Sequence, residues 1–218
     1  MALDPQAIAA NLARIRERVG PAVEVLAATK YVEAGDLPAL SEGGVTLVGE
    51  NRSDALEAKQ EAHGELFTWD FIGHLQSRKV REVIGRVRLI HSLDSLSAAS
   101  QIQARATAPV DCLLQLNMAG EDSKSGIEPD GLDEFLEGLA PMTSVHLCGL
   151  MTMPPLTDDP ERARPWFAGL REVRDRLAPQ WQGRHDLTHL SMGTSQDYGA
   201  AADEGATIVR VGSVLFTR

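Results

Sequence analysis

Lys30 ends the apolar run VEVLAATK at residues 23–30. A buried strand over this run would deliver a primary amine to the rim of a core, where the amine could attack a carbonyl group and form a Schiff base. Partial burial and neighbouring positive groups would favour the neutral amine that this chemistry needs. More often, a lysine at a strand end covers apolar surface with its stem and keeps its ammonium in water. The residues at the other strand ends must therefore show whether Lys30 has a chemical role.

Two glycine-containing turns near the end of the chain could hold an anion. They contain Gly193, Thr194 and Ser195 in the first turn, and Gly212 and Ser213 in the second. Backbone N–H groups and the positive end of a helix attract phosphate, although ordinary turns use the same residue types. A lysine amine beside a phosphate site fits pyridoxal phosphate held on Lys30, or a sugar-phosphate carbonyl in a cofactor-free aldolase.

Short apolar runs alternate with helical patterns along the chain. The apolar runs predict eight strands, at residues 23–30, 46–51, 68–74, 88–93, 110–117, 145–153, 186–193 and 207–216. Helices are predicted between them, at residues 53–64, 76–85, 95–106, 130–140, 160–178 and 195–205. In the longest helix, an apolar stripe is formed by Phe167, Leu170, Val173 and Leu177, and Pro165 is expected either near the first turn or at a kink.

This alternation predicts parallel strands, because a helix supplies the dozen or more residues that each crossover needs. Eight such units predict a (β/α)8 TIM-type barrel that forms a single domain over residues 1–218, with an open doubly wound sheet as the alternative. An additional helix precedes the barrel. It starts after Asp4 with Pro5 in its first turn, places Ile8 and Leu12 on one face, and ends at Gly20.

In such a barrel, the carboxyl ends of the strands form one functional face. The residues at or near these ends are Lys30, Asn51, His74, Ser92, Asn117, Met151 to Met153, Ser191 to Ser195, and Arg210 to Ser213. Each has a simple structural explanation when taken alone, since Asn51 and Ser92 could cap the following helices and a lone histidine such as His74 is usually a hydrogen-bonded structural residue. Their convergence predicts a functional site.

Composition limits the partners and the compartment. The 218 residues are 43% hydrophobic and carry a net charge of −10, which disfavours nonspecific binding to nucleic acid or to an anionic membrane. The first residues do not read as a signal peptide, and no run is long enough to span a membrane. Cys112 and Cys148 lie in separate strand-like segments without metal-ligand spacing, which predicts reduced core thiols and a cytoplasmic protein.

Several segments together resemble the pyridoxal phosphate homeostasis protein family, a single-domain relative of the alanine racemase barrel. They are LAATKY, LVGENR, WDFIGHLQSRK, HSLDS, DSKSGI, GLMTM, LSMGTSQD and TIVRVGSVLF, and they span nearly the whole chain. The resemblance implies that Lys30 holds pyridoxal phosphate as a Schiff base. It implies phosphate contacts from Ser195, Gly212 and Ser213 with backbone help from Thr194, a place for Arg210 at the pyridine nitrogen, and Asn51, His74 and Met151 around the pocket.

The same resemblance suggests a holder of the cofactor rather than an efficient enzyme. An arginine at the pyridine nitrogen disfavours its protonation and weakens the ring as an electron sink. Alanine racemase takes a second catalytic base, a tyrosine, from an additional β domain, whereas Tyr31 and Tyr198 are the tyrosines here and neither lies in such a domain. The expected function is therefore storage, delivery or buffering of pyridoxal phosphate in vitamin B6 and amino-acid balance. The expected state is a monomer, with apo pyridoxal-phosphate enzymes as recipients.

Two other functions stay open at this point: a pyridoxal-phosphate enzyme with weak racemase or lyase activity, and the cofactor-free aldolase. The chain also departs from the family pattern in detail. Thr194 stands where methionine is more frequent, Tyr31 stands where proline or threonine is common, and the chain reads LFTR where a glycine usually follows the phenylalanine. Lys124 in DSKSGI matches a family lysine near the cofactor, and its role is left open.

Overall fold

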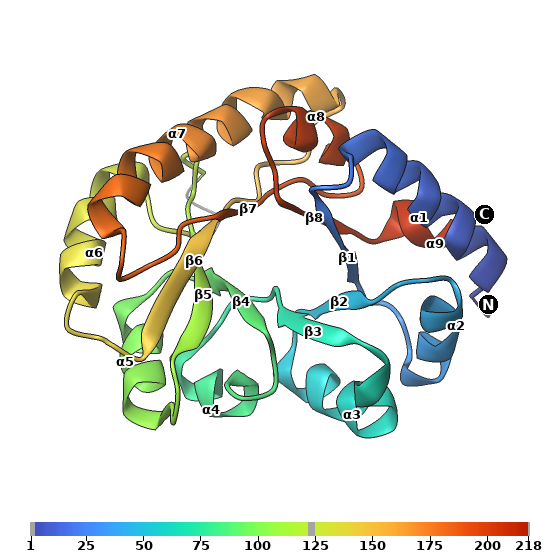
Figure 1. The fold of residues 1–218 in the computed structure, drawn as a ribbon, viewed down its shortest axis with the longest axis horizontal. Helices are drawn as coiled ribbons and strands as arrows, with labels where there is room; N and C mark the ends of the chain where they lie inside the picture. Colours follow the sequence, from blue (N-terminus) through green and yellow to red (C-terminus); the bar gives the residue numbers. More distant parts are fainter. Residues whose placement is uncertain (1–2, 122–124, 218) are drawn as a thin grey trace.

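Eight parallel strands form a closed barrel (Figure 1). The computed structural model describes residues 3–121 and 125–217, so Lys124 lies outside the described residues. The strands pair in sequence order and β8 closes onto β1, which confirms the predicted (β/α)8 barrel over the open sheet. The strands are β1 (Glu24–Ala28), β2 (Leu47–Glu50), β3 (Thr68–Phe71), β4 (Leu89–Leu93), β5 (Val110–Gln115), β6 (Val145–Met151), β7 (His189–Ser191) and β8 (Ile208–Val211).

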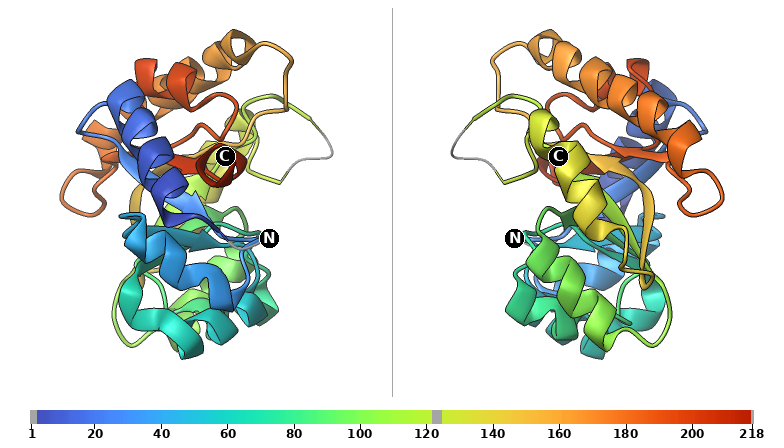
Figure 2. Two further views of the ribbon diagram at one scale, coloured as in Figure 1. Left: turned by 90° about the vertical axis from the view of Figure 1, so that its right-hand side faces the viewer. Right: turned by 90° about the vertical axis from the view of Figure 1, so that its left-hand side faces the viewer.

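Helices surround the barrel on its outer side (Figures 1 and 2). They are α1 (Pro5–Val19), α2 (Leu37–Glu42), α3 (Ser53–His63), α4 (Val80–Val83), α5 (Leu96–Arg105), α6 (Leu132–Leu139), α7 (Arg164–Trp181), α8 (Tyr198–Asp203) and α9 (Ser213–Phe216). Short 3-10 turns, η1 (Ala34–Asp36), η2 (Gly64–Leu66), η3 (Ser77–Lys79), η4 (Pro129–Gly131) and η5 (Pro160–Ala163), complete the connections. The short helix α2 was not among the predicted helices. Pro165 lies in the first turn of α7, as predicted.

The first helix follows its sequence signals closely. The carboxylate of Asp4 accepts a hydrogen bond from the backbone N–H of Gln6 at 3.0 Å, Pro5 occupies the first turn, and Gly20 ends the helix with a φ of 84°. The predicted apolar face is buried against the barrel, with Ile8 fully covered and Leu12 only 3% exposed. Capping and periodicity together therefore determine this element.

The end of the chain differs from the prediction. The strand expected over residues 207–216 stops at Val211, and the chain turns at Gly212 into the helical segment α9. The apolar run does not continue the strand because its last residues pack outside the barrel, on α1. The side-chain amide of Asn11 on α1 donates to the carbonyls of Leu215 at 3.0 Å and Thr217 at 2.7 Å, which holds the turn in place.

The apolar core has two layers. The larger layer lies between the strands and the surrounding helices. A smaller cluster joins side chains from strands on opposite sides of the barrel, including Leu26 of β1 and Leu113 of β5, so it fills the inside of the barrel. Both cysteines are free and buried, and burial raises the pKa of the Cys148 thiol to about 12. These findings support the prediction of reduced core thiols.

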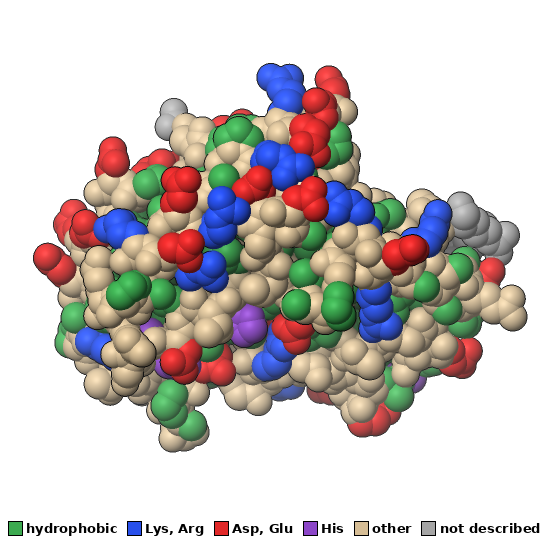
Figure 3. All heavy atoms as spheres, turned by 45° about the horizontal axis from the view of Figure 1, so that its top comes forward, with side chains coloured by type: hydrophobic (Ala, Val, Ile, Leu, Met, Phe, Trp, Pro, Cys, Tyr) green, Lys and Arg blue, Asp and Glu red, His purple; other side chains and the backbone are tan. Residues whose placement is uncertain are grey.

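Acidic and basic side chains are mixed over the helical surface (Figure 3). Ion pairs between helices contribute to this pattern, for example Arg18 with Asp203 at 2.8 Å between α1 and α8, and Arg171 with Glu204 at 2.7 Å. The net charge is thus spread out rather than gathered in a single patch on this face. Within the described residues, none of the helices combines the length and the apolar character that a membrane crossing requires.

Candidate functional site

Lys30 lies at the carboxyl end of the barrel, beyond the end of its strand. Strand β1 stops at Ala28, and Lys30 is exposed in the turn that follows rather than partly buried at the strand end as predicted. Its Nζ lies 4.8 Å from the centre of the Tyr31 ring. Because Ala27 pairs with Val211 on β8, the Lys30 turn and the Gly212 turn leave adjacent strands at the same end of the barrel.

A buried ion pair fixes the backbone directly before Lys30. Lys59 on α3 donates to the carboxylate of Glu50 at the end of β2, and also donates to the backbone carbonyl of Thr29 at 2.7 Å. The Thr29 hydroxyl donates to the same carboxylate at 2.7 Å. The Lys59 and Glu50 side chains are 8% and 1% exposed, so the buried lysine near this end of the barrel has a positioning role. The exposed Lys30 keeps its amine available.

Arg210 is a buried cation without a carboxylate partner among the described residues. Its guanidinium donates to the backbone carbonyl and the hydroxyl of Ser191, at 2.7 and 2.5 Å, and to the carbonyl of Thr152 at 2.9 Å. Burial lowers the pKa of Arg210 to about 10. Isolated buried charge is costly, and proteins usually pair it, so this arrangement is a signal of function.

A line of polar side chains crosses the barrel interior from Arg210 to the other end. The Ser191 hydroxyl lies 2.9 Å from Nδ1 of His91, and Nε2 of His91 lies 3.0 Å from the carboxylate of Asp70. Arg88, at the amino end of β4, then donates to Asp70 at 3.0 and 2.7 Å. Asp70, His91 and Ser191 are fully buried. We call these five residues the polar column.

The hydrogen bonds of the polar column run in one direction. Burial lowers the pKa of His91 despite its contact with Asp70, so the imidazole is neutral. The Asp70 carboxylate can only accept, which assigns the His91 proton to Nε2 and leaves Nδ1 to accept from the Ser191 hydroxyl. That hydroxyl in turn accepts from Arg210. The column therefore holds the guanidinium of Arg210 in one orientation at the carboxyl end of the barrel.

The two glycine turns meet through Ser195. Its hydroxyl accepts the backbone N–H of Gly212 at 2.9 Å and is 3.5 Å from the backbone N of Val214. Ser213 lies between these two residues and is exposed at the start of α9. The Ser195 hydroxyl thus accepts hydrogen bonds from backbone N–H groups in an exposed turn. An oxygen of a bound anion could accept hydrogen bonds from the same kind of donors.

The other turn differs from its prediction. Helix α8 starts at Tyr198 rather than at Ser195, because the buried carboxylate of Asp197 holds the residues before it in a turn. The N–H and the hydroxyl of Thr194 both donate to this carboxylate, at 2.6 and 3.0 Å. Gly193 has a φ of 90°, and a Cβ there would lie 2.6 Å from Cβ of Ala201, so the turn requires glycine.

The remaining predicted residues surround this end of the barrel. Asn51 and His74 are exposed in the turns after β2 and β3, and Met151 is buried in the cluster inside the barrel. His74 Nδ1 lies 3.4 Å from the carboxylate of Asp94. Asp94 was not predicted. Its Oδ1 atom is buried without a hydrogen-bond partner among the described residues, and burial raises the pKa of this carboxyl.

Sequence reasoning also missed most of the polar column and the ion pair behind Lys30. One signal was available, since Asp70 and His91 interrupt the apolar runs TWDFIGH and RLIHSL. A polar residue inside a strand that is otherwise apolar indicates a buried hydrogen-bonded group. Its partner could not be read from the sequence, because the contacts join β3, β4, β7 and β8.

Comparison with known proteins identifies the class to which this barrel belongs. Residues 3–218 match the family model described as the alanine racemase N-terminal domain. Two relatives are each named pyridoxal phosphate homeostasis protein. The relative from Aquifex aeolicus is 41% identical over 220 residues, covering 94% of this chain and 96% of that protein. The relative from Pseudomonas aeruginosa is 33% identical, covering 96% of this chain and 94% of that protein.

The solved structures agree with this assignment. PipY of Synechococcus elongatus, in a structure described as having PLP bound, matches with a TM-score of 0.87 and 32% identity, covering 96% of this chain and 100% of that chain. The chain belongs to the pyridoxal phosphate homeostasis protein family.

Proposed function

We propose that this protein binds pyridoxal phosphate reversibly through a Schiff base on Lys30 and acts in intracellular pyridoxal phosphate homeostasis and amino-acid balance. The observation that carries the proposal is the buried guanidinium of Arg210, which hydrogen-bonds only to neutral oxygens among the described residues. It lies on the strand next to the one that leads to Lys30. Membership of the family and the PLP described in the PipY structure support the same conclusion.

The residues fit the functional groups of the cofactor. Lys30 provides an exposed amine for the aldehyde. Arg210 provides an N–H donor for the pyridine nitrogen, and a fixed cation there favours the unprotonated ring. The turn containing Ser195, Gly212 and Ser213 provides a hydroxyl and backbone N–H groups for the phosphate. When bound, pyridoxal phosphate supplies an aldehyde that condenses with amines and a ring that withdraws electrons.

Other members of the site have smaller roles in the proposal. Gly193 and Thr194 shape the first turn, and the Thr194 N–H is already used by Asp197, so its help to the phosphate requires that this bond opens. Asn51 and His74, which are exposed, would border the pocket on its outer side, and Met151, which is buried inside the barrel, would lie beneath it. The ion pair of Lys59 and Glu50 holds the backbone that carries Lys30.

The site suits holding of the cofactor better than catalysis. A pyridine nitrogen faced by arginine is a weak electron sink, and the exposed Lys30 turn leaves the amine accessible to exchange with water or with other amines. We therefore propose a cytoplasmic monomer that passes the cofactor to apo pyridoxal-phosphate enzymes. If the protein is an enzyme rather than a holder of the cofactor, the following experiments would detect weak racemase or lyase activity, or aldolase activity.

The attachment is tested by reducing the cofactor-loaded protein with borohydride and mapping the modified peptide. The chain has four lysines, Lys30, Lys59, Lys79 and Lys124, so the map is simple. We expect modification of Lys30, and loss of the Schiff-base absorbance in Lys30→Ala but not in Lys79→Ala. Modification of another lysine, or an unchanged spectrum in Lys30→Ala, would overturn the assignment.

The role as a holder is tested separately. Loaded protein is mixed with an apo pyridoxal-phosphate enzyme in the presence of an enzyme that destroys free cofactor, and recovery of activity is followed. Protected transfer is expected, together with no α-proton exchange across a panel of amino acids. Rapid substrate-dependent exchange would indicate an enzyme. Protein that carries no cofactor but traps a sugar-phosphate carbonyl on Lys30 would indicate an aldolase.

A further inference from the structure

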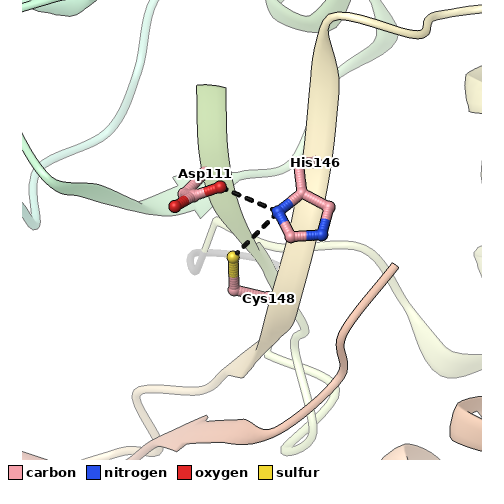
Figure 4. A group of neighbouring side chains, drawn as sticks. All are labelled: Asp111, His146 and Cys148. Carbon is pink, nitrogen blue, oxygen red and sulfur yellow. Dashed lines mark hydrogen bonds and ion pairs between the residues drawn. The ribbon is translucent and has the colours of Figure 1, made fainter. Parts of the chain in front are cut away.

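Three side chains with metal-binding atoms meet at the amino end of the barrel, opposite to Lys30. Asp111 comes from β5, and His146 and Cys148 come from β6 (Figure 4). Nδ1 of His146 lies 2.8 Å from Oδ1 of Asp111 and 3.4 Å from Sγ of Cys148. One ligand atom from each residue lies within 4.8 Å of the other two. None of these groups belongs to the proposed cofactor site.

Strand pairing brings the three residues together. Asp111 and His146 are register partners on the parallel strands β5 and β6. Cys148 lies two residues after His146, on the same face of the strand, at a break in register where Leu147 pairs with Cys112 and the next pair is Gly149 with Leu113. The cysteine is therefore the extra residue of a β-bulge, a feature that redirects side chains.

A fourth residue lies near the second ring nitrogen of the histidine. Oδ2 of Asp186 lies 3.6 Å from Nε2 of His146, on the side of the ring away from Asp111 and Cys148. Histidine ligands of metals commonly donate their second ring N–H to a carboxylate, which fixes the tautomer and strengthens the ligand. Here the carboxylate of Asp186 would leave Nδ1 free to bind a metal.

The cluster is open to solvent on the side of Asp111 and His146, whereas Cys148 lies buried behind them, and the carboxylate favours a cation. The side chains of Asp111 and His146 are 48% and 28% exposed. Asp111 also lines a hollow on the surface that it shares with residues 105–110 and Arg88. Arg88 does not oppose a cation strongly, because it is already paired with Asp70 and Glu24.

We propose that Asp111, His146 and Cys148 bind a divalent transition metal of the zinc type. One carboxylate, one imidazole and one thiolate form a mixed O, N and S set that suits zinc and excludes magnesium and calcium, which prefer oxygen ligands alone. Ligand atoms around a tetrahedral zinc are roughly 3.3–3.7 Å apart, so small side-chain rotations suffice. Binding forms the metal–sulfur bond and releases the thiol proton to solvent. Water fills the fourth position.

Cobalt(II) added to the full-length purified protein, followed by zinc, tests the site. We expect one equivalent of cobalt to give a thiolate-to-cobalt charge-transfer absorption in difference spectra, and zinc to remove it. The variants Cys148→Ser and His146→Asn should lose this absorption and weaken cobalt binding at least about tenfold. Asp186→Asn should keep the absorption with about tenfold weaker binding. Cys112→Ala, which changes the other cysteine, should behave as the parent protein does.

A second measurement keeps the result independent of spectral overlap with the cofactor. Zinc should raise the melting temperature of the parent protein and of Cys112→Ala, but not that of Cys148→Ser, with circular dichroism confirming that each variant is folded. Absence of the charge-transfer absorption in the parent protein would overturn the proposal. Cobalt binding by Cys148→Ser with the affinity of the parent protein would also overturn it, because the thiolate of Cys148 would then not be a ligand.

Discussion

Arg88 and Arg210 lie at opposite ends of the same barrel and are stabilised in opposite ways. Arg88 is held by the carboxylates of Asp70 and Glu24, and these hydrogen bonds raise its pKa even though burial acts to lower it. Arg210 hydrogen-bonds to neutral oxygens, and burial lowers its pKa to about 10. Carboxylates of the fold thus balance the arginine at the amino end, whereas the arginine at the carboxyl end has only neutral hydrogen-bond acceptors among the described residues.

The two arginines are also physically connected. The polar column links Arg88 through Asp70, His91 and Ser191 to Arg210. The ion-paired Arg88 can therefore fix the orientation of the Arg210 guanidinium through these hydrogen bonds. In barrels of this kind, the amino face serves stability and the carboxyl face serves function, and the column shows one route by which the first supports the second.

The largest expected effect on stability follows from removing the ion pair between Asp70 and Arg88. Asp70→Asn removes a buried carboxylate and leaves Arg88 partly uncompensated, so the free energy of unfolding should fall by about 3 kcal/mol. Urea denaturation measures this loss. Glu24→Gln is the control, because it affects a half-exposed pair with the same arginine and should cost less than about 1 kcal/mol. Equal losses in the two variants would contradict the comparison.

The unpaired end should respond differently. Arg210→Met loses three hydrogen bonds but removes a buried charge that lacks a carboxylate, so the loss of stability should be about 1–2 kcal/mol. The same variant should bind pyridoxal phosphate at least about tenfold more weakly, because the ring nitrogen loses its donor. Fluorescence titration with the cofactor and urea denaturation separate these effects. A stability loss as large as that of Asp70→Asn, with unchanged binding, would assign Arg210 to structure.

The turn at Ser195 allows a smaller and more specific test. Ser195→Ala leaves the Gly212 N–H without its acceptor and should reduce stability by about 1 kcal/mol. It should weaken the binding of pyridoxal phosphate more than that of pyridoxal, which lacks the phosphate. Competition by inorganic phosphate provides a second measurement. Equal weakening for both ligands would argue against a phosphate role for this hydroxyl.

Opposite pH dependences are the smallest expected effect. Hydrogen bonds from His91 and Arg88 lower the pKa of Asp70 despite its burial, so this carboxylate stabilises the fold above pH 3.8 and its contribution is lost as the pH falls. Burial raises the pKa of Asp94, so its carboxyl reduces stability as the pH rises above 3.8. Asp94→Asn should therefore be more stable than the parent at pH 7, and this gain should disappear below pH 3.8. Denaturation curves at several pH values measure the difference, and a gain that grows at low pH would have the wrong sign.

The sequence predicted those features that depend on local patterns. Alternating elements specified the barrel, and the Asp4–Pro5 signal specified the start of α1. The predicted end of β8 was wrong because the apolar residues 214–216 pack on α1, a contact that periodicity cannot reveal. Lys30 was expected to be partly buried and is exposed, because the strand stops two residues earlier.

The sequence predicted those site residues that lie at the carboxyl ends of strands, because these ends meet on one face of the barrel. Lys30, Arg210 and Ser195 each follow or end a strand, so the barrel rule groups them. The pair of Ser191 and His91 forms because two inward-facing residues on distant strands lie at the same height along the barrel axis. Local sequence patterns do not contain this information. The same limit applies to Cys148 and Asp111, whose spacing along the chain gives no sign of their proximity.

Closure of β1 onto β8 has a consequence for the order of assembly during synthesis. Lys30 lies near the start of the chain, and Arg210 and the Gly212 turn lie near its end, so the two halves of the proposed cofactor site become neighbours only when the last strand joins the first. Contacts of such large sequence separation form late and slowly in folding. A nascent or truncated chain would lack the pocket, and cofactor capture would thus mark a completely folded barrel.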